Sequence, residues 1–190
     1  MIKMFYSGTY NARHELINKD NVCEMLKDDV RSKIVGDVAR TVYASDGVVV
    51  KDNPKVLYIG GFYYEKEHKG RSDCENVVIE ELSQIDRCDL IVVNLRKYSA
   101  IASVTEMIYG AMRGKKIIIF CDPKITNYKI SGEYWFPILT AKMLNKNIEV
   151  RFVESDEEIV DFIKNMKEDD YNDSNRRNRW SLQDEYDKCA

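Results

Sequence analysis

The segment from Ser103 to Lys116, SVTEMIYGAMRGKK, contains a carboxylate that could have either of two uses. Glu106 follows Ser103 by three residues, which is the spacing of a capping box, where the two residues bind each other's backbone N–H groups at a helix start. A carboxylate near a helix N-terminus also stays ionised at neutral pH, so Glu106 could instead attack an electrophilic carbon. The pattern alone favours the structural use, because such caps are common.

Regularly spaced strands and helices must position this carboxylate. Three segments are almost continuously apolar, as strands buried on both faces are: 55–62, 89–95 and 115–121. Weaker strand patterns lie at 2–8 and 148–154. Helical patterns separate the strands, at 21–35, 75–86, 103–114, 135–145 and 156–166. This alternation predicts an α/β fold: a three-layer, flavodoxin-like or Rossmann-like doubly wound sheet of about five parallel strands.

A site in such a sheet lies at the carboxyl ends of the strands, where neighbouring connections leave in opposite directions. A strand order of 2-1-3-4-5 places this crevice between the first and third strands, with Glu106 in the first turn of the helix that enters it. We expect the substrate-binding residues at these strand ends and in the loop before Glu106: Tyr6, Gly8, Thr9, Tyr10, Gly61, Asn94, Ser99 and Ser103.

Several classes of function lack their sequence signals. No GxxxxGK[ST] loop, no GxGxxG after the first strand and no GxSxG occurs, so the usual triphosphate, dinucleotide and α/β-hydrolase sites are not indicated. The 5 cysteines form no CxxC pair and only 2 histidines are present, so we expect no metal and no cofactor. The net charge of -3 indicates neither a nucleic acid polymer nor a membrane as a partner.

Length and composition are typical of one globular domain, with 190 residues of which 44% are hydrophobic and 32% charged. We predict a domain over 1–167 and a disordered tail over 168–190, which is polar and without period. Residues 36–54 could extend the first helix or form a small hairpin that turns at Asp46-Gly47. The chain shows no signal-peptide pattern and no membrane-spanning run, so we expect it to be cytoplasmic.

Three segments give the chain a family resemblance: MFYSGTY, IEELSQIDRCDLIVVNL and SVTEMIYGAMRGKKIIIF. Over roughly residues 1 to 166 it resembles the nucleoside 2-deoxyribosyltransferase superfamily, which includes the 2'-deoxynucleoside 5'-phosphate N-hydrolases. In the last segment, Glu106, Tyr109, Gly114 and Lys115 match the family pattern without a gap.

The resemblance implies catalytic roles for two carboxylates. Glu106 corresponds to the nucleophile that attacks the anomeric carbon, which reverses the preference for a helix cap. Glu81 corresponds to the carboxylate that helps to protonate the leaving base. It is in phase with the apolar stripe of its predicted helix, which Val78, Leu82 and Ile85 form, although an acid at the edge of that stripe could also be purely structural.

Several positions depart from the family pattern, among them Thr9 and Asn11, which stand where the hydrolases have a phosphate-binding serine and arginine. Ala100, next to Ser99, stands where members have a group for sugar or phosphate recognition, and Phe5, next to Tyr6, stands where a tyrosine commonly binds the nucleophile. The leading hypothesis is cleavage or transfer at the N-glycosidic bond of a (deoxy)nucleoside or nucleotide. The alternative, motivated by Ala100, is a non-catalytic nucleotide-binding or sensing module with the same fold.

The segment 126–142 indicates self-association. It contains Tyr134, Trp135 and Phe136 in a row, and a helix packed against one sheet buries only a stripe of its surface. What is known of the family implies pockets completed by a neighbouring subunit. We therefore expect a homodimer or higher homo-oligomer with this segment at the interface.

Overall fold

The computed structural model describes residues 1–8, 29–36, 47–61, 71–127, 131–167 and 171. In this part of the chain a six-stranded sheet has the order β2-β3-β1-β4-β5-β8. Its strands are β1 (Ile2–Gly8), β2 (Val48–Val50), β3 (Asn53–Gly60), β4 (Leu90–Leu95), β5 (Lys116–Cys121) and β8 (Ile148–Phe152). All neighbouring pairs are parallel except β2 with β3. The predicted order 2-1-3-4-5 is thus confirmed for the five parallel strands.

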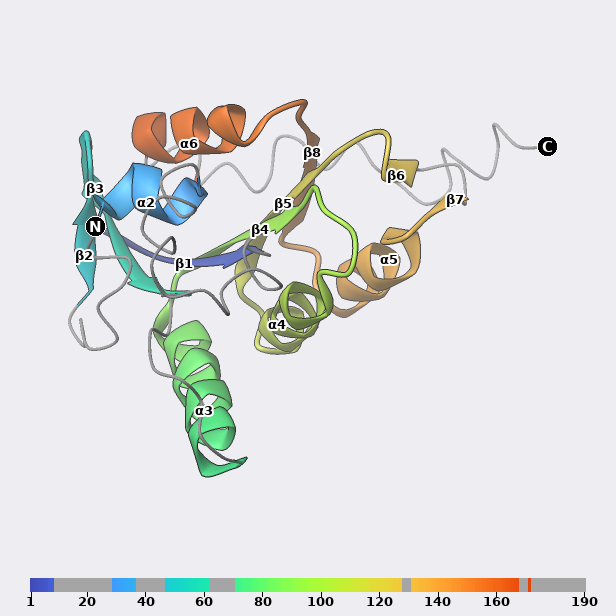
Figure 1. Ribbon diagram of the computed structural model, residues 1–190, viewed down its shortest axis with the longest axis horizontal. Coiled ribbons are helices and arrows are strands. Elements are labelled where there is room, and N and C mark those ends of the chain that lie inside the picture. Colours follow the sequence, from blue (N-terminus) through green and yellow to red (C-terminus); the bar gives the residue numbers. More distant parts are fainter. Residues whose placement is uncertain (9–28, 37–46, 62–70, 128–130, 168–170, 172–190) are drawn as a thin grey trace, which may run out of the picture.

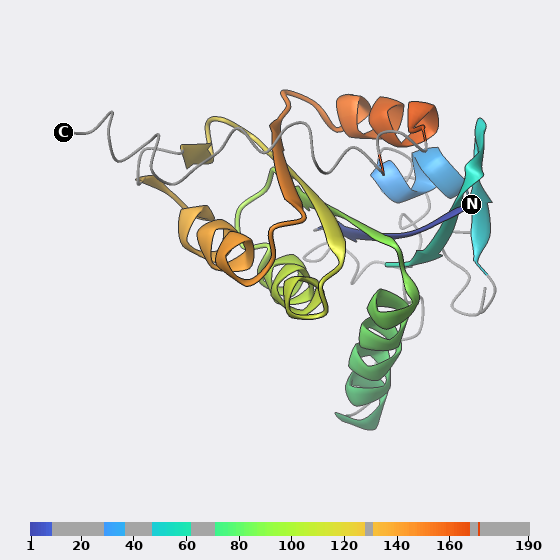
Figure 2. The ribbon, with the colours of Figure 1, turned by 180° about the vertical axis from the view of Figure 1, so that it is seen from behind.

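Helices cover both faces of the sheet and make three layers (Figure 1, Figure 2). On one face lie α2 (Val30–Val35) and α6 (Asp156–Asn165), and on the other lie α3 (Arg71–Arg87), α4 (Ile101–Met112) and α5 (Trp135–Leu144). A two-stranded antiparallel sheet, β6 (Thr126–Asn127) with β7 (Ser131–Gly132), follows β5. The predicted α/β class and three-layer architecture are confirmed.

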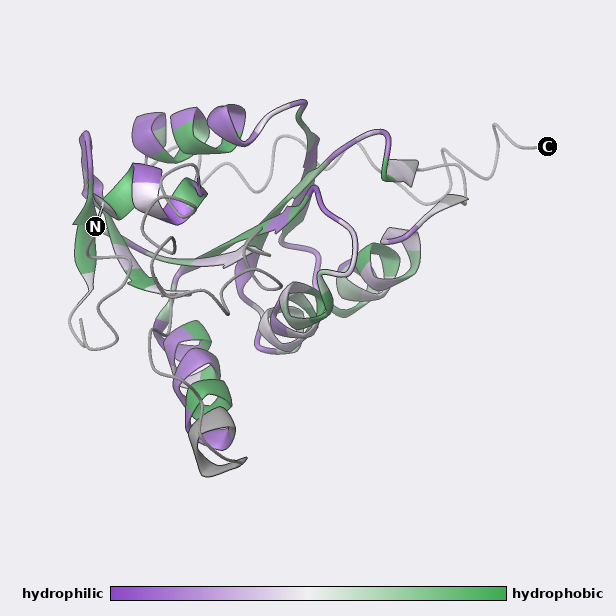
Figure 3. Ribbon diagram, viewed as in Figure 1, coloured by the Kyte–Doolittle hydropathy of each residue, from purple (hydrophilic) through white to green (hydrophobic). Residues whose placement is uncertain are grey.

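Each face of the sheet has its own apolar cluster, because successive side chains of a strand point to opposite faces. On the α2–α6 side, Tyr6 packs with Ile34 and Ile159. On the α3–α4–α5 side, Phe5 packs with Met107. Figure 3 shows that α6 has hydrophobic as well as hydrophilic residues, as expected for a helix that buries one side.

Of the segment 36–54, for which the sequence left a longer helix and a hairpin open, residues 37–46 lie outside the described residues. Helix α2 ends at Val35, so it is not extended, and Gly47 leads into β2. The chain reverses at residues 51–52 between β2 and β3, where Asp52 has a φ of 64°. Aspartate is among the few residues that adopt this conformation readily, while the three consecutive valines of β2 favour a strand. The extension of the first helix is therefore wrong, whereas Asp46 lies outside the described residues and the turn at Asp46-Gly47 stays a prediction.

Helix α4 begins two residues earlier than predicted, and this changes the interpretation of Glu106. Its N-cap is Ala100, which has no side-chain capping bond. The backbone N–H groups before the helix find acceptors on the α5 side: that of Ala100 binds Tyr134 Oη at 2.9 Å and that of Ser99 binds Glu133 Oε1 at 2.6 Å. The Ser103–Glu106 capping box is wrong, because Ser103 already lies inside the helix.

Candidate functional site

The candidate site lies at the carboxyl ends of β1 and β4, where the topology of the sheet predicts a crevice. The chain leaves β1 for β3 on one side and returns from β3 to β4 on the other, so β1 and β4 flank the switch point of the sheet. In the β1–β4 ladder, Ser7 pairs with Val93 and Gly8 pairs with Asn94. Both strands are buried along their whole length except at Lys3. The site is therefore built on two of the most buried strands of the sheet.

Glu106 reaches this crevice from the second turn of α4. Its carboxylate oxygen Oε2 accepts a hydrogen bond from the hydroxyl of Ser7 in β1. Glu106 is half-buried, whereas Ser7 is only 1% exposed. The side chain thus binds the end of a strand and does not cap its own helix.

Tyr6 points to the other face of the sheet. Its ring is 2% exposed and lies under the guanidinium of Arg31, 4.9 Å from the ring centroid. The phenol oxygen accepts a hydrogen bond from Asn94 Nδ2 at 3.0 Å, and burial is the main cause that raises the pKa of Tyr6 far above its usual range. Tyr6 and Asn94, both predicted to bind substrate, are brought together, and here they bind each other.

Arg31 links the ends of β1 and β3, and the sequence interpretation did not identify it. Its Nε donates to Gly61 O at 2.5 Å and its Nη2 to Gly8 O at 2.7 Å, while Asp29 lies 3.4 Å from Nη1. The residue is 4% exposed. Arg31 precedes Ile34 by three residues, so the two lie on the same side of their helix. A cation on an apolar stripe is unusual, and this signal could have identified Arg31 from the sequence.

Gly61 closes the end of β3 in a conformation that suits glycine. Its φ is 81°, and a Cβ there would lie 1.9 Å from the carbonyl oxygen of Tyr6. Its N–H donates to Gln84 Oε1 at 3.3 Å, and its carbonyl accepts from Tyr58 Oη at 2.7 Å. Gly61 therefore lies at the carboxyl end of β3, where close packing of the strand ends requires glycine.

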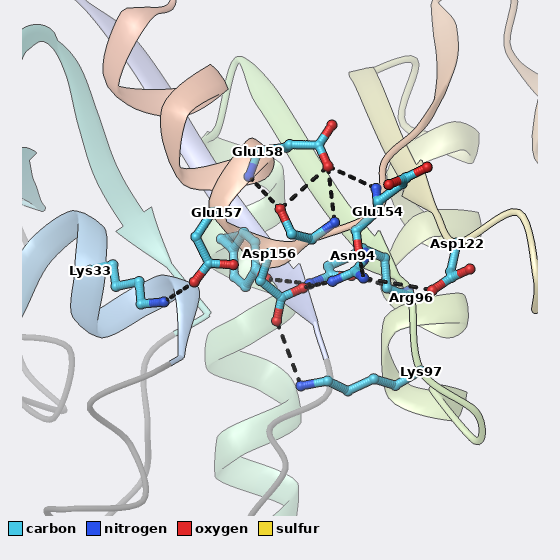
Figure 4. A network of polar contacts seen from close by, with 11 residues as sticks. Lys33, Asn94, Arg96, Lys97, Asp122, Glu154, Asp156, Glu157 and Glu158 are labelled. Atoms are coloured by element: carbon cyan, nitrogen blue, oxygen red, sulfur yellow. Dashed lines mark hydrogen bonds and ion pairs between the residues drawn. The ribbon is translucent and has the colours of Figure 1, made fainter.

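A polar network extends from Asn94 to the start of α6 (Figure 4). Asp156 Oδ1 accepts hydrogen bonds from Asn94 Nδ2 at 3.1 Å and from Arg96 Nη1 at 2.6 Å, and Lys97 Nζ lies 3.8 Å from Oδ2. Arg96 Nη2 also donates to Glu154 O at 2.5 Å. The sequence interpretation missed Arg96 and Asp156, because Asp156 looks like an ordinary acid in the first turn of a helix.

Ser99 and Ser103 lie on either side of the first residue of α4. Ser99 is exposed and adopts a φ of 62°, which places the loop in a conformation uncommon for a residue other than glycine. Ser103 is 3% exposed. The two serines flank the entry to the helix of Glu106, and the structure gives neither of them a bond to that carboxylate.

Glu81 is half-buried on α3. Burial is the main cause that raises the pKa of Tyr58, and the nearby charge of Glu81 adds a smaller increase. The predicted stripe holds at Ile85, which is fully buried, and at Leu82, but Val78 is 54% exposed because the N-terminal half of α3 projects from the body (Figure 1). Glu81 therefore lies at the point where the helix meets the sheet.

Two predicted site residues, Thr9 and Tyr10, lie outside the described residues, as does the predicted tail apart from Tyr171. No helix in the described ranges is long and apolar enough to cross a membrane. A scan against models of known protein families finds no match, and a search of curated proteins finds none either. The function must therefore be argued from the geometry of the site and from the resemblance in sequence.

Proposed function

We propose that this protein cleaves or transfers the N-glycosidic bond of a (deoxy)nucleoside or nucleotide, with Glu106 as the nucleophile. The observation that supports this most is the hydrogen bond between Ser7 and Glu106. Helix α4 begins after Ala100 without a side-chain cap, and the bond to Ser7 holds the carboxylate of Glu106 at the carboxyl edge of the sheet, where open α/β sheets bind ligands.

The proposed reaction has two steps, as in retaining glycoside hydrolysis. Glu106 attacks C1' of the sugar, a C–O ester bond forms and the C–N bond breaks, and its electron pair leaves with the base. Glu81 in its acid form protonates the departing base. Water or a second base then attacks C1', Glu81 takes up the proton of that nucleophile, and Glu106 leaves as a carboxylate. No step requires a metal or cofactor.

The second part of the proposal is the role of Glu81. It rests on the resemblance and on the half-buried position of Glu81 close enough to Tyr58 for its charge to act there. Glu81→Gln should slow substrates with poor leaving bases more than substrates with activated ones, because a general acid matters most when the base leaves as a poor anion. Equal slowing of both kinds would assign Glu81 to structure.

The decisive experiment is incubation with a panel of nucleosides and nucleotides, with chromatography for free base. Release of base from one class of substrate, absent in Glu106→Gln, supports the proposal. Binding without any release favours the alternative, a non-catalytic nucleotide-binding or sensing module, which the apolar Ala100 on the sugar side would suit. Equilibrium dialysis of the same panel separates these two outcomes.

The proposal includes a homodimer or higher assembly that uses the α5 region. Of the three consecutive aromatic residues there, Tyr134 is 3% exposed but Phe136 is 65% exposed. Nearby, Ile101 at the start of α4 is 75% exposed, and Tyr98 in the loop before α4 is 64% exposed. Exposed apolar side chains that gather in one region are typical of interfaces. Light scattering tests this: an active species of 22.2 kDa, the mass of one chain, would contradict it.

The proposed location is the cytoplasm, and the cysteines of the described residues agree with a reducing compartment. Cys88 and Cys121 are free and buried. Burial raises the pKa of each thiol to about 12, so neither is a reactive thiolate at neutral pH. Both act as small apolar side chains of the core.

A further inference from the structure

Ser7 is a buried polar side chain in the centre of the sheet, next to the end of β1. Its backbone lies in a strand that pairs with β3 on one side and with β4 on the other. The residue is 1% exposed, and its hydroxyl donates to Glu106 Oε2 across a separation of 99 residues. A hydroxyl held this firmly can fix the orientation of the group that accepts its hydrogen bond.

The side chains of β1 alternate between the two faces of the sheet, and this decides which of them can bind Glu106. Phe5 points to the same face of the sheet as Ser7 but carries no hydroxyl, and it packs in the apolar cluster under α4. Tyr6 has a hydroxyl, but it points to the opposite face and accepts a hydrogen bond from Asn94. Of these three consecutive residues, Ser7 alone brings a donor to Glu106.

We propose that Ser7 is a positioning residue for Glu106, an inference that rests on the proposed function. Its hydrogen bond orients the carboxylate toward C1'. Binding to Oε2 also sets which way the carboxylate plane faces the crevice. The effect belongs to the step in which the glycosyl-enzyme forms, because a misaligned nucleophile slows attack without weakening the binding of substrate.

The test compares three variants in single-turnover and burst kinetics of base release. Ser7→Ala removes the donor, and the rate of the burst should fall by about ten- to a hundredfold, the range expected for a hydrogen bond to a charged group, while KM stays within about twofold. Ser7→Thr keeps the hydroxyl and should restore most of the rate. Thr105→Ala is the control, since it removes an exposed hydroxyl one residue from Glu106 that binds only the backbone of α4.

The burst amplitude counts active molecules, so a loss of folded protein lowers the amplitude and a positioning defect lowers the rate. If Ser7→Ala does not fold, Ser7→Cys replaces it, because a thiol is a weaker donor, and an intermediate rate is expected. If Ser7→Ala, or Ser7→Cys in its place, releases base at the burst rate of the parent, this inference is overturned while the proposed function stands. Failure of Ser7→Thr to restore the rate also overturns this inference. Absence of base release from the parent protein overturns the proposed function and this inference with it.

Discussion

The two ends of α4 make contacts of different kinds, one near the carboxyl edge of the sheet and the other near its amino edge. Toward the carboxyl edge, Glu106 accepts a hydrogen bond from a serine that is almost fully buried. Toward the amino edge, Tyr109 and Arg113 bind the exposed carboxylate of Asp86 at the end of α3, with Tyr109 Oη 3.0 Å from Oδ2 and Arg113 Nε 2.7 Å from Oδ1. One end holds a carboxylate against the end of β1, and the other joins two helices at the surface.

This difference divides the segment on which the family resemblance depends most. Glu106 lies at the candidate site, whereas Tyr109, Gly114 and Lys115 lie at the opposite edge. Lys115 Nζ donates to the carbonyl oxygen of Asp86 in the last turn of α3 at 2.7 Å and to that of Cys88, just after this helix, at 2.9 Å. A contiguous sequence match can therefore combine one residue for chemistry with several that hold the helix in place.

The largest expected effect separates the two ends directly. Glu106→Gln should lower base release by about a thousandfold or more, because an amide is not a nucleophile, although its oxygen can still accept the hydrogen bond from Ser7. The melting temperature should stay close to that of the parent. Tyr109→Phe is the matched control at the other end, and its activity should equal that of the parent. Activity within about tenfold of the parent in Glu106→Gln would remove Glu106 from the mechanism.

Lys115→Met should produce the largest loss of stability at the amino edge. It removes two charge-assisted hydrogen bonds to the last carbonyls of α3 and should lower the free energy of unfolding by about 1.5–3 kcal/mol. Urea unfolding measures this, and the kcat per folded molecule should not change. A drop in kcat without a drop in stability would show that the two ends of α4 are coupled.

Gly114→Ala tests the turn that ends α4. The N–H of Gly114 binds Ala111 O and that of Lys115 binds Gly110 O, both at 3.0 Å, which is a Schellman motif with Gly114 at a φ of 68°. No atom lies within 4 Å of an added Cβ, so the cost is that of the backbone conformation alone, about 1–2 kcal/mol of unfolding free energy. Gly114→Asn, which tolerates this conformation better, should lose less. Equal losses in Gly114→Ala and Gly114→Asn would show that a contact of the added side chain, and not the backbone conformation, causes the loss of stability.

The fold could be predicted from the sequence because a local run of apolar residues marks each of the central strands. The apolar runs of β4 and β5 are buried at nearly every position, and the strand order followed from rules of chain connection. The start of α4 could not be predicted in this way, because its flanking N–H groups bind Tyr134 and Glu133, which lie 34 residues away. The same pattern, Ser-x-x-Glu, does form a capping box at Ser155 in α6.

The site could be predicted only in part, for a related reason. The position of Glu106 near the carboxyl end of β1 followed from topology and resemblance. The bonds that define its surroundings join distant residues: Ser7 lies 99 residues from Glu106, and Arg31 lies 30 residues from Gly61. Such pairs leave no periodic signal in a single sequence. A cation on an apolar stripe, as at Arg31, is the kind of local conflict that marks such a residue.

The smallest expected effect is the pH dependence of the Asp86–Arg113 pair. The hydrogen bond from Arg113, helped by a weaker one from Tyr109, lowers the pKa of Asp86 from its usual 3.8 to about 2. Because the folded pKa is the lower one, the pair stabilises the fold above about pH 4 and loses this contribution as the pH falls toward 2. Both side chains are well exposed, 52% for Arg113 and 36% for Asp86, so the effect should be small and weaker in salt. The difference in urea midpoint between the parent and Asp86→Asn should be constant from pH 5 to 7 and shrink below pH 4. A difference that grows as the pH falls would show that the carboxylate of Asp86 does not stabilise this end of α4.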